Sequence, residues 1–129
     1  MALIRRGIHR GAHVGEDQVA VFGRLTEAVQ AAEDTGFDAI FMPDHIYDPG
    51  GVGLPRVRDV HGYRALAAVT SSTTLLTLAS PITLRAPGLL AKAVTTLDVI
   101  SGSRAVLSAG IGWDVAEQRH TGSSFPWVG

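Results

Sequence analysis

Apolar residues recur at helical spacing in three stretches of the chain, residues 19–35, 62–72 and 87–100. Intervals of three and four residues place the apolar side chains on one face, so each stretch is predicted to be an amphipathic α-helix. The apolar face of the first stretch consists of Phe22, Leu25, Val29 and Ala32. Asp17 is expected to cap the start of this helix, and Gly36 suits the left-handed conformation that ends it.

Short apolar runs outside these stretches predict three β-strands, at residues 38–42, 74–79 and 104–110. They are almost continuously apolar rather than alternating, which is typical of parallel strands that are covered on both faces. A further strand should precede the first helix, and its only candidate is the segment ALIRRGIH at residues 2–9. Because two arginines interrupt this segment, residues 1–18 are expected to be weakly structured.

The predicted elements alternate between strand and helix, and the strands recur at roughly 30 to 36 residues, the length of a βαβ unit. This order predicts an α/β fold with a parallel sheet. Residues 46–61 are rich in glycine and proline and are predicted to form a loop, whose length is typical of functional loops. A short helix is expected within the segment GIGWDVAE, after the last strand.

Composition places the chain among folded proteins of one domain, because it has 129 residues, 46% apolar and 18% charged. The absence of cysteine excludes disulfides, zinc fingers and thiol catalysis. A net charge of −1 gives no electrostatic reason to expect nucleic acid or an anionic membrane as a partner. No apolar run approaches the roughly 20 residues of a membrane span, and no secretory signal is recognised, so a cytoplasmic location is expected.

Polar residues and glycines follow directly after the predicted strands. In a parallel sheet all strands point the same way, so residues just past each strand gather at one edge, where α/β proteins bind ligands. This edge is predicted to carry Pro43, Asp44, His45, Ser80, Pro81, Arg85, Gly110, Ile111, Gly112 and Trp113. An acid, an imidazole, a hydroxyl, a glycine-rich turn and a large aromatic ring together form a coherent ligand site.

Each of these features also has an interpretation without function. Asp44 and His45 are either functional side chains or a turn and a helix cap. The segment 110–112 is either an anion cradle formed by backbone N–H groups or a tight turn. Trp113 either stacks on a planar ring or packs at the end of the barrel. The histidines are not spaced as in known metal motifs, so no metal ligand is predicted.

Two pairs of residues beside this edge carry structural expectations. The Ser80–Pro81 bond is open to the cis form, which about 5–6% of such bonds adopt, and a cis bond there would move the backbone toward a bound ring. Asp98 and Arg104 flank the turn after the third helix and are predicted to form a structural ion pair.

Three blocks of sequence resemble the bacterial luciferase-like oxidoreductases, and most closely the branch that uses the deazaflavin coenzyme F420. The blocks are AEDTGFDAIFMPDH at residues 32–45, RAPGLLAKAVTTLDVISGSR at residues 85–104 and AGIGWDVAE at residues 109–117. The resemblance extends over most of residues 25–122. The second block is the most specific, because it fits the family pattern at nearly every position.

This resemblance implies a (β/α)8 barrel that binds a flavin or deazaflavin at the C-terminal ends of its strands. It implies hydride transfer or monooxygenation on a small organic substrate, with coenzyme F420 as the cofactor and FMN as the alternative. By the resemblance Asp44 and His45 lie beside the coenzyme ring, and His45 is the acid/base. The resemblance also brings four further residues to the coenzyme, namely Ser80, Gly110, Ile111 and Gly112. Glu117 matches a glutamate position of the family and is interpreted as structural.

A full barrel of this kind needs about 250 residues. The chain is therefore expected to form a partial (β/α)8 TIM barrel of about the first four β/α units, as one truncated domain of residues 1–129. The open edge of its fourth strand is expected to pair with a second copy, in a homodimer, or with another barrel half. Three hypotheses stay open: an F420-dependent oxidoreductase, a non-catalytic fragment or partner subunit, and a metal-dependent barrel hydrolase.

Overall fold

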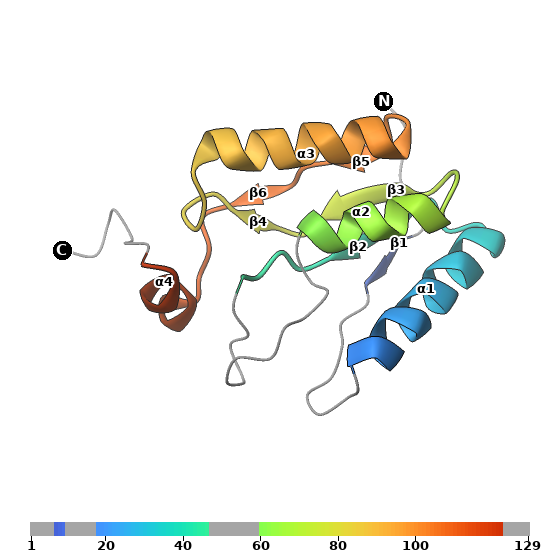
Figure 1. Cartoon of the computed structure of the whole chain (residues 1–129), viewed down its shortest axis with the longest axis horizontal. Helices are drawn as coiled ribbons and strands as arrows, with labels where there is room; N and C mark the ends of the chain where they lie inside the picture. The colour runs from blue at the N-terminus through green and yellow to red at the C-terminus, as the bar shows by residue number, and fades with distance from the viewer. Residues whose placement is uncertain (1–6, 10–17, 47–59, 123–129) are drawn as a thin grey trace.

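Helices and strands alternate along residues 7–9, 18–46 and 60–122, the parts of the chain that the computed structural model describes (Figure 1). In chain order the elements are β1 (Gly7–His9), α1 (Gln18–Asp34), β2 (Ala39–Met42), α2 (Val60–Val69), β3 (Thr74–Thr77), β4 (Ser80–Pro81), α3 (Pro87–Ser101), β5 (Ala105–Val106), β6 (Ala109–Gly110) and α4 (Val115–Thr121). No helix in these parts is long and apolar enough to cross a lipid bilayer. The expected cap Asp17 and most of the predicted loop lie outside the described residues.

Four strands form a parallel sheet in the order β1-β2-β3-β5, and β4 pairs with β6 in a second, two-stranded parallel sheet. Leu75 of β3 lies in register with Ile40 of β2 and with Ala105 of β5. The α/β fold with parallel strands is therefore confirmed. An initial strand is confirmed as well, because β1 lies within residues 2–9 and pairs with β2.

The strand predicted at residues 104–110 is divided into β5 and β6, because its two halves pair with different strands. Between them the Thr77 hydroxyl bonds both the N–H and the carbonyl of Ser108, at 3.2 Å each. A side chain thus joins the two segments where the regular ladder is interrupted. The strand predicted at residues 74–79 ends at Thr77, and β4 follows it. It is divided because β3 pairs with β2 and β5, whereas β4 pairs with β6.

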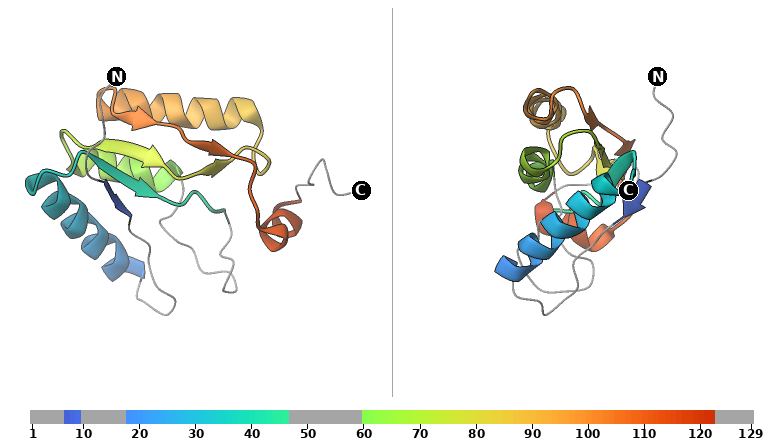
Figure 2. Two further views of the ribbon diagram at one scale, coloured as in Figure 1. Left: turned by 180° about the vertical axis from the view of Figure 1, so that it is seen from behind. Right: turned by 90° about the vertical axis from the view of Figure 1, so that its right-hand side faces the viewer.

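The hydrophobic core lies between the four-stranded sheet and the helices α1, α2 and α3. Figure 2 shows α2 and α3 side by side on one face of the sheet. The core side chains are Leu25, Val29, Ile40, Met42, Tyr63, Leu66, Ala67, Leu75 and Leu97. Full burial of a side chain of this kind stabilises a fold by about 1.5–3 kcal/mol. The apolar face predicted for α1 is confirmed at Leu25, Val29 and Ala32, which are all buried.

Tyr63 ties the ends of β2 and β3 together inside this core. Its hydroxyl accepts a hydrogen bond from the Met42 N–H and donates one to the carbonyl of Leu76. Burial raises the pKa of Tyr63 above its ordinary value, so the hydroxyl keeps the proton that it donates. Because Met42 directly precedes residues 43–45, these bonds fix the point at which that polar segment leaves the sheet.

Arg104 joins the turn after α3 to the end of α2. The two terminal nitrogens of its guanidinium donate to the carbonyl oxygens of Ala67, Thr70 and Thr73 at distances from 2.8 to 3.1 Å. The expected ion pair between Asp98 and Arg104 is wrong, since Asp98 instead accepts the N–H of Ala105 at 3.2 Å. The five N–H donors of a guanidinium suit a cluster of carbonyl oxygens at the end of a helix.

Glu33, near the end of α1, holds the turn that follows α2. Its carboxylate accepts the N–H groups of Ser71, Ser72 and Thr73 at distances from 2.6 to 3.0 Å. These bonds explain why α2 ends at Val69, before the boundary predicted at residue 72. Partial burial acts to raise the pKa of Glu33, but the N–H donors together lower it from 4.5 to about 2.

The low pKa of Glu33 makes the stability of the fold depend on pH. Since the pKa is lower in the folded chain than in the unfolded chain, the carboxylate stabilises the fold fully above pH 4.5. This contribution is lost as the pH falls from 4.5 toward 2. We expect Glu33→Gln to be less stable than the wild type above this window and equal to it at the acid end. Urea unfolding across the window measures the difference, with the exposed Glu27→Gln as control; a difference that does not vary with pH contradicts this account.

Candidate functional site

Residues beyond the carboxyl ends of the parallel strands line a pocket of about 290 Å³. The arrow of β3 in Figure 1 points toward this end of the sheet. It is lined by His45, Leu78, Ala79, Pro81, Gly110, Ile111, Gly112, Trp113 and Glu117. These residues follow β2 and β3, belong to β4 and β6, or lie at the start of α4. The volume is near the lower end of the range for small-molecule sites, roughly 300 to 1,000 Å³. The predicted ligand edge thus has a pocket at the predicted end of the sheet.

His45 stands in this pocket with one ring nitrogen fixed. Its Nδ1 lies 2.8 Å from Oε2 of Glu117, and the other carboxylate oxygen accepts the N–H of Ile46 at 2.6 Å. The side chain of Glu117 is 3% exposed and that of His45 is 20% exposed. The carboxylate therefore engages both the imidazole and the backbone beside it, and Nε2 is the ring nitrogen left for a ligand.

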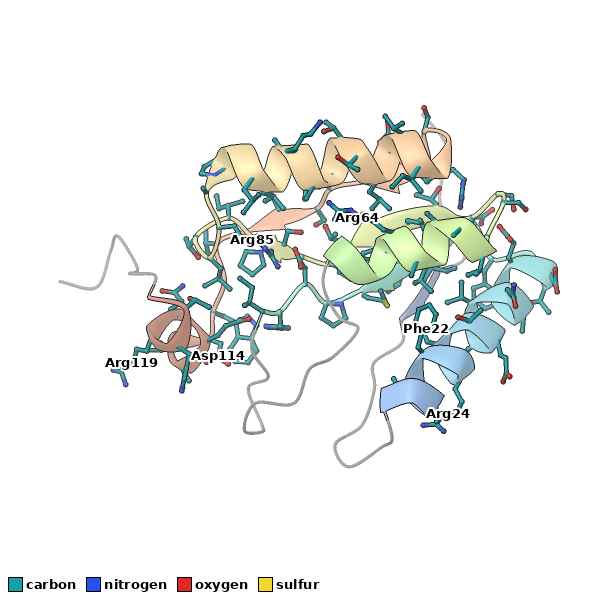
Figure 3. The ribbon with its side chains drawn as sticks, in the orientation of Figure 1. Phe22, Arg24, Arg64, Arg85, Asp114 and Arg119 are labelled. Carbon is teal, nitrogen blue, oxygen red and sulfur yellow. The ribbon has the colours of Figure 1, made fainter. Side chains whose placement is uncertain are left out.

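The start of α4 explains why Glu117 reaches His45. Asp114 takes an extended conformation and caps the helix, and its side chain accepts the N–H groups of Ala116 at 2.8 Å and Glu117 at 3.2 Å. Figure 3 shows Asp114 at this end of α4, with Arg119 farther along the helix. The cap fixes the first turn of α4, so the Glu117 side chain is held at the pocket. Glu117 was predicted to be structural, and its contact with His45 did not follow from the sequence.

Asp44 has a different partner from its neighbour His45. Its side chain is fully buried and accepts two hydrogen bonds from Arg85, at 2.7 and 2.8 Å, in a bidentate ion pair. Arg85 itself is 10% exposed and lies near the end of the sheet (Figure 3). Asp44 and Arg85 do not belong to the pocket lining, so a coenzyme contact by Asp44 stays a prediction.

Two glycines and two small residues form a close-packed wall of the pocket. A Cβ atom on Gly110 would lie 3.3 Å from the Cβ of Ala79. Gly112 has a φ of +78°, which favours glycine, and a Cβ atom there would lie 3.3 Å from that of Pro81. Glycine at both positions lets this segment pack closely against Ala79 and Pro81, and it leaves the backbone exposed to the pocket. A tight turn at residues 110–112 is therefore compatible with their place in the pocket lining, and the anion cradle stays a prediction.

Ser80 and the cis peptide lie at the base of this wall. The cis bond joins Leu78 to Ala79. The Ser80–Pro81 bond, which was open to the cis form, is trans. Ser80 is fully buried, and its hydroxyl has no hydrogen-bond partner among the described residues. It adjoins the lining residues Ala79 and Pro81 without lining the pocket, so its predicted coenzyme contact stays untested.

Trp113 is 72% exposed, although it is one of the largest side chains of the chain. Its ring meets that of His45 edge to face, with centroids 6.1 Å apart and an angle of 84°. An exposed tryptophan at a pocket buries little against its own chain. Of the two interpretations of Trp113, stacking on a ligand agrees better with this exposure than packing does.

The fold and the site together define a class of protein, a partial (β/α)8 barrel with its ligand edge at the C-terminal ends of the strands. The sequence profile of the luciferase-like monooxygenase family matches residues 2–127, and the chain belongs to this family. An uncharacterised protein of Mycobacterium tuberculosis strain H37Rv is 29% identical over 106 residues, which cover 70% of this chain. The chain spans about 38% of the length of such curated relatives.

Solved structures agree with the partial barrel. The oxygenating component of 3,6-diketocamphane monooxygenase from Pseudomonas putida, solved with FMN, has a TM-score of 0.77 at 18% identity and matches 93% of this chain and 33% of its own. The coenzyme F420-dependent tetrahydromethanopterin reductase from Methanopyrus kandleri has a TM-score of 0.69 at 27% identity. That match covers 97% of this chain and 32% of the reductase. Each of these two neighbours thus contains more than nine-tenths of this chain's fold within about a third of its own length.

Proposed function

We propose that the pocket beside His45 holds the ring of a flavin or deazaflavin. We further propose that the chain functions as an oxidoreductase on a small organic substrate. The observation that carries this proposal is the imidazole of His45, fixed by a buried carboxylate, in the same pocket as a wall of small residues. An imidazole can gain and lose a proton near neutral pH. A narrow wall of glycine and alanine suits the flat face of a ring.

The lining residues fit such a ring in shape and in chemistry. Gly110 and Gly112 pack so closely on Ala79 and Pro81 that a Cβ atom at either position would lie 3.3 Å from these side chains. Leu78 and Ile111 offer exposed apolar surface, 48% and 59% respectively, and Trp113 offers an aromatic face. A planar, mostly apolar ring would bury these surfaces. A compact charged ligand would not.

A bound flavin or deazaflavin would supply hydride chemistry at this site. With an alcohol as substrate, the coenzyme would accept the hydride, with its electron pair, from the carbon–hydrogen bond. His45 would take the proton of the substrate's oxygen–hydrogen bond at Nε2. In the reverse direction His45 returns the proton to the oxygen. Monooxygenation, the alternative within the same family, would use FMN and oxygen.

Coenzyme F420 is the favoured cofactor and FMN is the alternative. The three sequence blocks resemble the F420-using branch of the family, and the F420-dependent reductase from Methanopyrus kandleri is 27% identical to this chain. A neighbour solved with FMN has the higher TM-score of the two, 0.77 against 0.69. Both coenzymes present a three-ring plane, so the pocket walls named above suit either one.

Coenzyme binding tests the proposal directly. The purified chain is titrated with F420 and with FMN, and binding is followed by coenzyme fluorescence. We expect saturable binding of one of them, and weakening by about 2- to 10-fold in Trp113→Ala, because a ring contact of this kind contributes about 0.5–1.5 kcal/mol. Val99→Ala is the matched control, since Val99 is 81% exposed on α3. A folded chain that binds neither coenzyme overturns the proposal.

The helix-free face of the sheet is the proposed contact for a second barrel half. Successive side chains of a strand alternate between faces, so the residues between the core positions point away from the helices. One row of them is in register across three strands, Phe41, Leu76 and Val106. In a barrel such a row lies in the interior. We therefore keep a homodimer, or pairing with another barrel half, as the proposed assembly, with a cytoplasmic location.

Size-exclusion chromatography with light scattering tests the homodimer. The 13.6 kDa chain is expected to have about twice this mass in solution. Val106→Lys should shift the chain to the monomer, because Val106 is a 43% exposed apolar side chain on β5, the edge strand of the proposed contact. The substitution would place a charge there. Val99→Lys on the outer surface of α3 is the control. A wild-type monomer at all concentrations rules out the homodimer.

The other hypotheses have less support. Among residues 7–9, 18–46 and 60–122, no three His, Asp or Glu side chains gather in a way that could hold a metal ion. A non-catalytic partner subunit remains the alternative to the enzyme. It predicts a folded chain with no saturable coenzyme binding, which the same titration detects.

A further inference from the structure

We infer that Glu117 is a positioning residue, which holds neutral His45 as the tautomer protonated at Nδ1 and so leaves Nε2 as the atom that takes a proton. The assignment of a reaction to Nε2 rests on the proposed function. The tautomer is a property of the chain itself and can be measured without any coenzyme.

In the hydrogen bond between His45 and an ionised Glu117, only the imidazole can be the donor. An ionised carboxylate accepts hydrogen bonds and has none to donate, so the proton of the 2.8 Å contact must belong to Nδ1. A neutral imidazole carries a single ring proton, and Nε2 is therefore unprotonated. It presents a lone pair, as a proton acceptor requires.

The second oxygen of Glu117 keeps the carboxylate in place. It accepts the N–H of Ile46 at 2.6 Å, so the carboxylate cannot rotate without losing a bond to the segment that carries His45. A glutamate at this position of a helix ordinarily reaches back to the cap residue's own N–H. Here both oxygens engage a segment that lies 71 and 72 residues earlier in the chain. The carboxylate thus joins α4 to the end of β2 at the pocket.

Burial strengthens this arrangement. The Glu117 side chain is 3% exposed, so water competes little for its oxygens, and a hydrogen bond is stronger in such surroundings. Asp44, the other carboxylate beside His45 in the chain, is held by Arg85 in a bidentate pair. Among the described residues, Glu117 is therefore the carboxylate that faces the imidazole. When Nε2 gains a proton, the imidazolium and Glu117 form a charge-assisted pair.

Nitrogen NMR of the chain labelled with ¹⁵N-histidine tests the inference, because the two tautomers give distinct ring-nitrogen shifts. Neutral wild-type His45 is expected to show a protonated Nδ1 and an unprotonated Nε2. In Glu117→Gln the amide can accept from Nδ1–H or donate to a bare Nδ1, so both tautomers should appear. The exposed Glu27→Gln should leave the wild-type pattern unchanged.

Activity supplies the second readout. Loss of a group that orients a catalytic histidine should lower kcat in Glu117→Gln by about 10- to 100-fold, with the coenzyme dissociation constant near that of the wild type. Wild-type His45 protonated at Nε2 overturns the inference, whether or not coenzyme binds. The expected tautomer in a chain that binds no coenzyme supports Glu117 as the positioning residue and overturns the proposed function instead.

Discussion

Replacing Arg85 with methionine is expected to lower the free energy of unfolding by about 3–5 kcal/mol, because it removes the positive charge that faces a buried carboxylate. Asp44 is fully buried and accepts two guanidinium bonds from Arg85, at 2.7 and 2.8 Å. Urea unfolding followed by circular dichroism gives the difference. A loss of this size is a large share of the stability of a small domain.

Two further variants show whether the loss comes from the ion pair. Arg119→Met removes an exposed arginine from α4 and should change stability by less than about 0.5 kcal/mol. The double variant Asp44→Leu with Arg85→Met replaces the pair by apolar side chains, and should recover most of the loss. A single Arg85→Met variant as stable as the wild type contradicts the buried pair.

Replacing His45 with glutamine is expected to lower kcat by roughly 10²- to 10⁴-fold, the usual contribution of a positioned acid/base. Glutamine keeps a polar group of similar reach, so the pocket keeps its shape, but its amide does not exchange a proton near neutral pH. The rate is measured as the change in F420 absorbance with a panel of small alcohols and carbonyl compounds. The coenzyme dissociation constant, from fluorescence, should change far less than kcat.

A second histidine provides the matched control. His120 is exposed on α4, and its Nδ1 contacts the carbonyl of Ala116 at 2.7 Å, away from the lining residues. His120→Gln should therefore keep the wild-type rate. If His45→Gln loses coenzyme binding and turnover to the same extent, His45 holds the coenzyme and the acid/base role is wrong.

Most of the fold could be predicted from local sequence patterns. The helix face that contains Leu25 and Val29 follows from spacing alone, and the continuous apolar runs predicted parallel strands. The break at Ser108 did not follow, because it depends on a hydroxyl of Thr77 that comes 31 residues earlier. The early end of α2 likewise depends on Glu33, which lies on another helix.

The site was predictable as a set of residue types but not as a set of contacts. Strand order placed His45 and residues 110–112 at one edge, and the pocket brings them together. The partners of Asp44 and His45 come from 41 and 72 residues later in the chain. No periodicity or spacing encodes such pairings. Two adjacent residues that looked like one functional pair therefore have separate partners in the folded chain.

The most direct test of the central claim is the response of His45 itself to coenzyme. ¹⁵N-histidine spectra are recorded while F420, and separately FMN, is added to the purified chain. We expect the ring signals of His45 to move with the same dissociation constant as the fluorescence titration, and those of His120 to stay in place. Saturable binding that leaves the His45 signals unchanged would place the coenzyme elsewhere and contradict the account.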